Sequence, residues 1–333
     1  MNRKVKIGNR LVGDGEPVFI IAELGANHDG KLSQALELID IAAESGADAV
    51  KLQLYYGSGL WPKSSKAYPI LKSLETNRGW MDQLLEHARK RKIILFAAPF
   101  DKEAVDLLER YDTPVYKWAS SEIFDIPLIK YAAAKKRPMI MSTGVCDLAD
   151  VQRAVDAVQS ANNENLILLH CVSSYPTKPE DTHLRMMETM RTAFQVPVGF
   201  SDHSLGIAIP IAAAARGACV IEKHFTLSHA LEGLDHAFAL EPDELKQMVK
   251  SIREVEKCLG SPIKTAVKGA EDTERIVRLF AAQDIPKGTE LTKDLITVKR
   301  EAFGIMPEHY EMVLGRETKG DIKADTPITW DLI

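Results

Sequence analysis

Short runs of apolar residues alternate with longer amphipathic segments between residues 18 and 225. Each run is rich in Val, Ile, Leu or Phe and is bounded by Gly, Pro, Asp or Asn, which is typical of strands buried on both faces. The runs are VFIIAEL (18–24), DAVKLQL (48–54), IILFAA (93–98), PVYKWAS (114–120), PMIMSTG (138–144), NLILLHC (165–171), VPVGFSD (196–202) and ACVIEKHF (218–225). The pattern predicts eight buried strands.

The segments between these runs have apolar residues at helical spacing, as in residues 32–43, where Gly46 follows the last turn. Further helical segments begin near Met81, Glu103, Ile126, Leu148, Gly206 and Glu241. Eight strand–helix units in about 245 residues match an α/β fold of the (β/α)8 TIM-barrel type. A doubly wound open sheet is the alternative, but it usually has a Gly-rich first loop, and neither G-x-G-x-x-G nor Walker A occurs here.

The alternation of apolar runs and amphipathic segments ends near residue 260. Residues 261–274, SPIKTAVKGAEDTE, are polar and predict a linker arm between a barrel domain at 1–260 and a small domain at 275–333. The small domain contains an internal repeat, because DIPKGTELTKDLI (284–296) and DIKADTPITWDLI (321–333) agree at seven of thirteen positions. We expect two equivalent strand–turn–strand elements in a small β-rich domain. A core this small is marginal unless the domain docks onto another surface.

Composition narrows the functional class. Lys and Arg number 42 against 47 Asp and Glu, a net charge of −5, which argues against a nucleic-acid scaffold or a polybasic membrane patch. Four scattered cysteines without a C-x-x-C pair suit a reducing compartment. The N-terminal residues lack the apolar core of a signal peptide, and no apolar stretch is long enough to span a bilayer. We therefore expect a cytoplasmic protein with no nucleic-acid or membrane partner.

Polar and charged residues gather at the C-terminal ends of the predicted strands. They are Glu23, Lys51, Gln53, Lys117, Ser142, Thr143, Ser201, Asp202, His203, Glu222, Lys223 and His224. In a TIM barrel these ends converge on one mouth, where active sites are built. Burying an unpaired charge costs several kcal/mol, so these groups must pair with each other, with a ligand or with a metal. An internal salt-bridge network, such as Lys51 with Glu23, is the purely structural alternative.

Two sets of residues at or near these strand ends suggest binding sites, one for an anion and one for a metal. Lys51 and Lys117, with the hydroxyl groups of Ser120, Ser142 and Ser201, describe a site for a small, multiply charged anion such as phosphate. A second set is formed by two histidines at the ends of successive strands, with carboxylates nearby. Such a pair suits a divalent metal such as Mn²⁺, Zn²⁺ or Fe²⁺, and hydrogen-bonded structural histidines are the alternative. These histidines are His203 and His224.

Several longer motifs resemble the sialic acid synthase family, the nonulosonate synthases that condense phosphoenolpyruvate with an N-acylated mannose-type sugar. The matching stretches are FIIAELGANHDG (19–30), GADAVKLQ (46–53), APFD (98–101), VYKWASSE (115–122), IMSTG (140–144), LLHCVSSYPT (168–177), GFSDHSLG (199–206) and IEKHFT (221–226). The C-terminal segment resembles the antifreeze-like (SAF) domain of that family, with IPKGTELT and VKR at 298–300. The resemblance covers nearly the whole chain in the same order.

The resemblance implies roles for individual residues. By this resemblance, the carboxylate and phosphate of phosphoenolpyruvate are bound by Lys51, Lys117, Ser120, Ser142 and Ser201. The sugar is contacted by Gln53, Tyr175 and Asp235, and the metal is bound by His203 and His224. Glu23 matches an acidic residue near the reacting carbons, with Glu122 and Glu222 close by. Arg300 matches a residue that the SAF domain inserts into the barrel mouth of a partner subunit, which implies a domain-swapped homodimer.

The implied reaction joins C3 of phosphoenolpyruvate to the aldehyde carbon of an open-chain sugar and expels phosphate. A divalent metal, with Mn²⁺ as the first choice and Mg²⁺ or Co²⁺ as alternatives, would polarise the aldehyde oxygen. Glu23 or Glu122 would be the base for the water that adds at C2. No organic cofactor is implied.

The acceptor sugar is left open between N-acetylmannosamine, the deoxy diacetamido sugars of legionaminate- and pseudaminate-type products, and an unacetylated analogue. Two other functions are alternatives. An enzyme that acts on a phosphorylated sugar would need further basic residues for the second phosphate. A non-catalytic sugar-binding factor for polysaccharide assembly would be expected to lack one of the charged residues. Two departures from the family pattern bear on specificity. Ala98 stands where a Thr is common, and Glu301-Ala302-Phe303 follow VKR in place of a Pro-Gly sequence.

Overall fold

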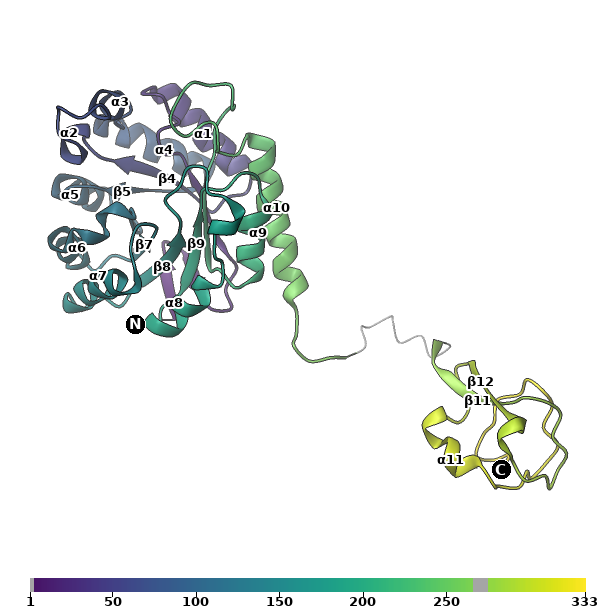
Figure 1. The fold of residues 1–333 in the computed structure, drawn as a ribbon. Helices are drawn as coiled ribbons and strands as arrows, with labels where there is room; N and C mark the ends of the chain where they lie inside the picture. Colours follow the sequence, from purple (N-terminus) through teal and green to yellow (C-terminus); the bar gives the residue numbers. More distant parts are fainter. Residues whose placement is uncertain (1–2, 266–274) are drawn as a thin grey trace. The chain divides into compact units, whose positions relative to one another are not determined.

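The computed structural model describes residues 3–265 and 275–333, and the chain divides into two compact units, Met1–Gly260 and Ser261–Ile333. The first unit is a closed barrel of eight parallel strands in sequence order, with β10 pairing with β3 to complete the circle (Figure 1). Its strands are β3 (Phe19–Glu23), β4 (Ala49–Leu54), β5 (Ile94–Pro99), β6 (Tyr116–Trp118), β7 (Met139–Ser142), β8 (Leu166–Cys171), β9 (Val198–Asp202) and β10 (Val220–His224). Seven of them lie within the predicted runs and β5 extends one residue beyond its run, to Pro99, so the predicted TIM barrel is confirmed.

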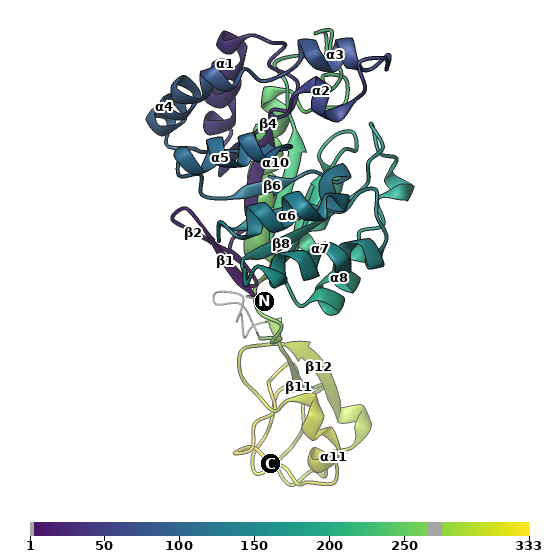
Figure 2. The same cartoon turned by 90° about the vertical axis from the view of Figure 1, so that its left-hand side faces the viewer.

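Helices follow the strands and cover the outside of the barrel (Figure 2). They are α1 (Leu32–Glu44), α4 (Met81–Arg91), α5 (Lys102–Arg110), α6 (Ile126–Ala133), α7 (Leu148–Ser160), α8 (Met186–Phe194), α9 (Ala208–Ala215) and α10 (Pro242–Leu259). Two short helices, α2 (Gly57–Leu60) and α3 (Tyr68–Ser73), interrupt the connection between β4 and α4. Among the residues described, no helix combines the length and apolarity needed to cross a membrane.

Side chains alternate between the inside and the outside of the barrel along each strand. In β3, Phe19 and Ile21 belong to the interior cluster, whereas Ile20 and Ala22 pack against the surrounding helices. The interior cluster also contains Ala49, Phe96, Val115, Ile140, Ile167, Leu169, Cys219 and Val220, and Ile94 packs against it. The next inward position of most strands is polar. The barrel therefore has an apolar layer at its N-terminal end and a polar layer at its mouth.

An N-terminal hairpin closes the apolar end of the barrel. It consists of the antiparallel strands β1 (Lys4–Ile7) and β2 (Arg10–Gly13), shown in Figure 2. Val5, Ile7 and Val12 are fully buried and join the interior cluster. This hairpin was not predicted from the sequence, because strands of four residues are too short to give a periodic hydrophobic signal.

Asp202 and Lys223, predicted as strand-end charges, lie on the outward faces of β9 and β10. The two residues are register partners, and Lys223 Nζ lies 2.6 Å from Asp202 Oδ2 with both side chains 0% exposed. Ser204 donates its backbone N–H and its hydroxyl to Asp202 Oδ1, at 3.0 and 2.7 Å. These charges are therefore satisfied under the helical layer and do not reach the mouth.

The second unit is a small domain with its own apolar core. Its elements are β11 (Val277–Ala281), β12 (Ile296–Arg300) and α11 (Tyr310–Val313), and β11 pairs antiparallel with β12. The two copies of the repeat bond reciprocally, because Asp284 Oδ1 accepts from Ala324 N and Asp321 Oδ1 accepts from Lys287 N, both at 2.8 Å. The two repeats are thus paired as predicted, but as turns joined by isolated bridges such as Ile285–Ile322, and the predicted strand–turn–strand form is wrong. Most of the predicted linker arm, residues 266–274, lies outside the described residues.

We predict that Lys223→Met lowers the free energy of unfolding by about 3–5 kcal/mol, because it leaves the Asp202 carboxylate buried without its counter-ion. Urea denaturation of the full chain, followed by far-UV circular dichroism, measures the change. Lys250→Met is the matched control: Lys250 is exposed and pairs only with Glu254 on its own helix, so its cost should stay below about 0.5 kcal/mol. Adding Asp202→Asn to Lys223→Met should recover part of the loss. Equal stability of Lys223→Met and Lys250→Met would contradict the assignment.

Candidate active site

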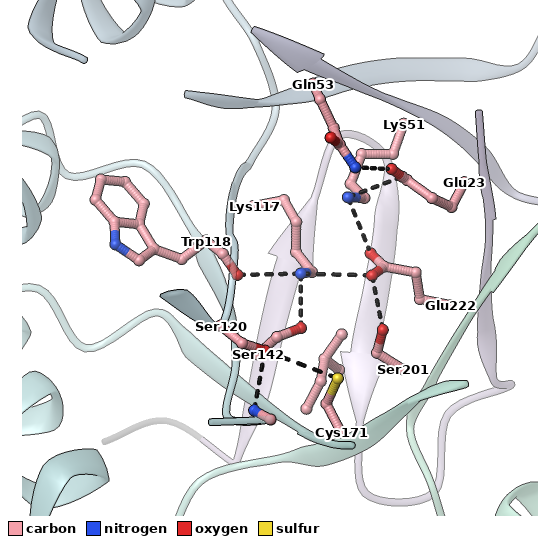
Figure 3. A network of polar contacts seen from close by, with 12 residues as sticks. Glu23, Lys51, Gln53, Lys117, Trp118, Ser120, Ser142, Cys171, Ser201 and Glu222 are labelled. Carbon is pink, nitrogen blue, oxygen red and sulfur yellow. Dashed lines mark hydrogen bonds and ion pairs between the residues drawn. The ribbon is translucent and has the colours of Figure 1, made fainter. Parts of the chain in front are cut away.

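The polar layer at the mouth is built from the last inward positions of the barrel strands. Figure 3 shows side chains from β3, β4, β6, β7, β8, β9 and β10 pointing toward one another inside the barrel. A small inner pocket, about 60 Å³, is lined by Glu23, Lys51, Gln53, Lys117, Ser120, Ser142, Cys171, Tyr175, Ser201, His203, Glu222 and His224, among others. A larger outer cavity of about 330 Å³ has Gln53, Ser120, Tyr175 and His224 in its lining as well. The two cavities therefore share residues.

Lys51 lies between two carboxylates. Its Nζ is 2.8 Å from Glu23 Oε2 and 3.7 Å from Glu222 Oε2, and all three side chains are at most 5% exposed. Gln53, the next inward residue of β4, donates from Nε2 to Glu23 Oε1 at 2.8 Å. The salt bridge between Lys51 and Glu23 that the sequence analysis gave as a structural alternative is therefore present in the ligand-free protein.

Lys117 lies on the other side of Glu222. Its Nζ donates to Ser142 Oγ at 2.7 Å and to the carbonyl of Trp118 at 3.0 Å, and it lies 3.4 Å from Glu222 Oε1. Ser201 donates its hydroxyl to the same Glu222 oxygen at 2.9 Å. Glu222 thus bridges the two ammonium groups, as Figure 3 shows.

The two carboxyl groups have opposite electrostatic environments. Burial raises the pKa of Glu23 to about 7, with the Glu222 charge adding to the increase and Lys51 opposing it. Burial would also raise the pKa of Glu222, but Lys117 and Lys51 outweigh it and lower that pKa to about 2. Burial would lower the pKa of Lys51, but Glu222 and Glu23 outweigh it and raise that pKa, whereas burial lowers the pKa of Lys117 in spite of the Glu222 charge. A bound anion would favour the charged form of Lys117, so the two amines suit an anionic ligand.

Hydroxyl groups surround the gap next to Lys117. Ser120 Oγ accepts from the backbone N–H of Gly144 at 2.9 Å and accompanies Ser142 in the lining of the inner pocket. A Cβ at Gly144 would lie 2.3 Å from Ser173 Oγ and 3.0 Å from Ser120 Oγ, so a side chain there would displace the Ser173 hydroxyl. Ser173 was not predicted, because it follows β8 in a loop where no strand periodicity marks it.

His203 and His224 lie side by side with their ring centroids 5.4 Å apart. The carbonyl of Val172 accepts from His203 Nδ1 at 3.0 Å, which leaves Nε2 with its lone pair. His224 Nδ1 is buried without a hydrogen-bond partner and lies 3.6 Å from Asp235 Oδ2. Burial and the neighbouring His224 lower the pKa of His203 to about 4, and burial also lowers the pKa of His224. Both rings are therefore neutral near pH 7.

The arrangement of the histidines fits an open metal site. Neutral imidazoles with free lone pairs are suitable ligands for a divalent metal, and the unpartnered nitrogen of His224 is available for such a bond. Within residues 3–265 and 275–333, no three His, Cys, Asp or Glu side chains gather at metal-ligand spacing. A metal bound between His203 and His224 would therefore need oxygen ligands from substrate or water.

The remaining predicted residues occupy different places. Asp235 lines the outer cavity, beside His224. Glu122 lies in the 3₁₀ helix Ser121–Phe124, where its carboxylate accepts from the Ser121 hydroxyl, and it lines neither cavity. Arg300 belongs to the second unit, at the exposed end of β12. The structure therefore gathers the predicted barrel residues, with Glu122 apart from them.

Besides Ser173, Cys171 and Tyr55 line the cavities and were not predicted as site residues. Cys171 lies in the floor of the inner pocket, with Sγ 3.7 Å from Ser120 Oγ, and it continues the inward series of β8. Its neighbour His170 points the other way and bonds the carbonyl of Thr182 at 2.7 Å. Strand alternation, counted from Ile167, identifies Cys171. Tyr55 lines the outer cavity from beyond the end of β4, where alternation no longer applies.

Comparison with protein families gives two matches. The NeuB family matches residues 38–264, and the SAF domain matches residues 278–333. Similar proteins include an uncharacterized protein of Methanocaldococcus jannaschii, 42% identical over 330 residues with 98% of each chain covered. The N,N'-diacetyllegionaminic acid synthase of Legionella pneumophila is 37% identical over 352 residues, covering 100% of this chain and 99% of its own. Human N-acetylneuraminate-9-phosphate synthase is 34% identical, with 97% and 95% covered. The resemblance found in the sequence is confirmed.

Solved structures agree with these matches. The N-acetylneuraminic acid synthetase of Leptospira borgpetersenii, solved with citrate, has a TM-score of 0.77 at 35% identity and covers 82% of this chain and 95% of its own. A truncated 3-deoxy-D-arabino-heptulosonate 7-phosphate synthase of Thermotoga maritima has a TM-score of 0.64 at 15% identity, over 79% of this chain and 95% of its own. The second likeness extends to the fold alone.

Proposed function

This chain belongs to the NeuB family, which includes synthases of sialic, legionaminic and pseudaminic acids, and from that premise we propose that it condenses phosphoenolpyruvate with an N-acylated amino sugar of the mannose type. One observation carries the proposal. Lys51 and Lys117 lie in an inner pocket that adjoins a larger cavity with room for a sugar. An anion held in the inner pocket would meet its co-substrate at this junction.

The inner pocket is the proposed phosphoenolpyruvate site. Carboxylate and phosphate oxygens would accept charge-assisted hydrogen bonds from Lys51 and Lys117. The hydroxyls of Ser120, Ser142 and Ser201 supply further donors around the same space. The ammonium groups are already positioned by Glu222, so little reorganisation is needed when the anion arrives.

Glu23 is the proposed base for the water that adds to C2. A general base is most effective when its pKa is near the working pH, and the pKa of Glu23 is raised to about 7. Gln53 and Lys51 hold its two oxygens at 2.8 Å and so fix its orientation. Glu122, the alternative base, lies outside the lining of both cavities, which favours Glu23.

We further propose that His203 and His224 hold a divalent metal, with Mn²⁺ as the first choice and Mg²⁺ or Co²⁺ as alternatives. The neutral rings and the unpartnered Nδ1 of His224 support this assignment. Such a metal supplies Lewis-acid polarisation of the acceptor carbonyl. The hydrogen bond from His203 Nδ1 to Val172 fixes the orientation of that ring.

The lining of the outer cavity bears on the identity of the acceptor. One part is apolar and consists of the side chains of Leu60, Leu71, Val145 and Leu234, together with neighbouring residues. Methyl and acetamido groups gain from contact with such a surface, whereas a hydroxyl placed there loses hydrogen bonds to water. This favours a deoxy diacetamido sugar over N-acetylmannosamine as the acceptor. Gln53, Tyr175 and Asp235 provide the polar contacts.

A homodimer in which Arg300 acts in the partner's site is also proposed. Arg300 ends β12 with its side chain exposed, and none of the hydrogen bonds or ion pairs found among the described residues involves that side chain. The core of the second unit is small, which favours docking. The SAF match to residues 278–333 includes Arg300.

We predict phosphate release from phosphoenolpyruvate with a deoxy diacetamido mannose-type sugar, and slower release with N-acetylmannosamine, in assays with Mn²⁺. Lys51→Met and Lys117→Met should each raise the KM for phosphoenolpyruvate about tenfold to a hundredfold, since each removes charge-assisted bonds worth about 1.5–3 kcal/mol. Lys130→Met, at an exposed position of α6, is the control and should behave as wild type. No release with any sugar, or an unchanged KM in a folded Lys117→Met variant, refutes the corresponding assignment.

Removal of divalent metal with a chelator should abolish product formation, and Mn²⁺, Mg²⁺ or Co²⁺ should restore it. The direct measurement is Mn²⁺ binding followed by electron paramagnetic resonance. His224→Phe should weaken Mn²⁺ binding because it removes the unpartnered nitrogen. His87→Phe is the control, since His87 bonds Asp40 away from both cavities. Full activity after verified metal removal contradicts the metal assignment.

Arg300→Ala and Glu23→Ala should each be nearly inactive, and mixing them under subunit exchange should restore activity if Arg300 acts in trans. Random exchange makes about half of the dimers mixed, each with one intact site of two, so roughly a quarter of wild-type activity should return. Native mass spectrometry verifies the exchange. Absence of recovery after verified exchange means that Arg300 serves its own barrel or takes no part in the site.

A further inference from the structure

A buried hydrogen-bond chain joins two loops beside the barrel mouth. The loop after β10 carries Thr226 and His236, and the segment after β3 carries Asp29. The His236 side chain is 1% exposed, with Nδ1 2.6 Å from Thr226 Oγ1 and Nε2 3.0 Å from Asp29 Oδ1. Gln34 of α1 donates to the other Asp29 oxygen at 2.6 Å. The carboxylate is thus held from two sides, and the ring is held from both nitrogens.

The donors and acceptors of this chain assign the tautomer of His236. A carboxylate oxygen only accepts, so Nε2 carries the proton of the bond to Asp29. Nδ1 then accepts from the Thr226 hydroxyl, whose oxygen in turn accepts from the backbone N–H of Ser228 at 3.3 Å. The Nε2–H tautomer therefore satisfies both ring nitrogens, and the carbonyl of Ser228, 3.4 Å from Thr226 Oγ1, is the other acceptor within reach of that hydroxyl.

The residue before His236 points toward the outer cavity and bonds the same segment. Asp235 Oδ2 accepts from the backbone N–H of Ala26 at 3.3 Å and lies 3.6 Å from His224 Nδ1. The two consecutive side chains thus attach to residues 26–29 at two points. Asp235 lines the outer cavity, whereas His236 does not.

Two glycines leave the space that this arrangement needs. Gly25 has a φ of +55°, and a Cβ there would lie 2.7 Å from Asp235 Oδ2. A Cβ at Gly233 would lie 2.5 Å from His236 Cδ2 and 2.8 Å from its Nε2. A larger residue at Gly25 would displace the Asp235 carboxylate, and a larger residue at Gly233 would displace the His236 ring.

We propose that His236 is a positioning residue, and that the Thr226–His236–Asp29 chain holds Asp235 in place for the acceptor sugar. The inference rests on the proposed function for the identity of the ligand. With His236 anchored, the backbone of Asp235 is fixed on one side by the ring and its carboxylate is fixed on the other by Ala26. A preorganised carboxylate loses little conformational freedom when it accepts hydrogen bonds from a sugar.

The kinetic test compares three variants of the full chain. His236→Phe keeps the ring volume and removes both hydrogen bonds, so the KM for the acceptor sugar should rise about three- to tenfold. The KM for phosphoenolpyruvate should stay within about twofold, because Lys51 and Lys117 are untouched. His236→Gln retains a donor and an acceptor and should recover part of the loss. His229→Phe is the control: it removes a hydrogen bond to Ala239 from the same loop and should leave the acceptor KM unchanged.

A second measurement does not depend on catalysis. Hydrogen exchange of residues 226–240, followed by mass spectrometry, should be faster in His236→Phe than in His229→Phe, and ¹⁵N NMR of the wild type should show the Nε2–H tautomer. A wild type that is inactive with every sugar overturns the proposed function. Hydrogen exchange and NMR would then still show whether His236 connects the loops after β3 and β10. The positioning role is overturned if His236→Phe raises both KM values equally, if it leaves the acceptor KM unchanged, or if exchange of residues 226–240 matches the control.

Discussion

The mouth of this barrel depends on the mutual compensation of four buried charged side chains. Removing a single ion from water costs several kcal/mol, and here Glu23, Lys51, Lys117 and Glu222 are all at most 5% exposed. They are tolerable only together, because Glu222 lies within 4 Å of both ammonium groups and Glu23 has a pKa of about 7 and so gives up part of its charge. The constraint explains why the polar residues converge on one place.

The remainder of the barrel provides the low-dielectric frame in which these charges act. The apolar interior layer and the N-terminal hairpin exclude water from the N-terminal end of the barrel, since Val5, Ile7 and Val12 fill the end opposite to the mouth. Electrostatic interactions are stronger in such surroundings than in water. The same frame makes an incomplete cluster costly, so each charged residue contributes both to the stability of the fold and to the binding of a ligand.

Outside the barrel, separate polar links hold the loops that carry the site. The Asp202–Lys223 pair lies behind the two histidines, because each of its members is the chain neighbour of one of them. The loops after β3 and β10 are joined by His236 and Asp29. Asp235 and His236 thereby bond the segment after β3 at two points, Ala26 and Asp29.

The sequence by itself determined the eight strands, most of the helices between them, the repeat in the C-terminal segment and the identity of most polar groups at the mouth. The helices α2, α3 and α8 were not predicted. The sequence determined the strands because buried parallel strands appear as short apolar runs. Charged residues at the ends of such strands are not expected in an apolar core, so they indicate a site at the barrel mouth. Strand alternation also separates His170 from Cys171. The tertiary structure alone decided which charges face the mouth, since Asp202 and Lys223 pair on the outer surface of the strands. It also placed Ser173, Tyr55 and the His236–Asp29 link, because contacts between loops distant in sequence follow no local periodicity.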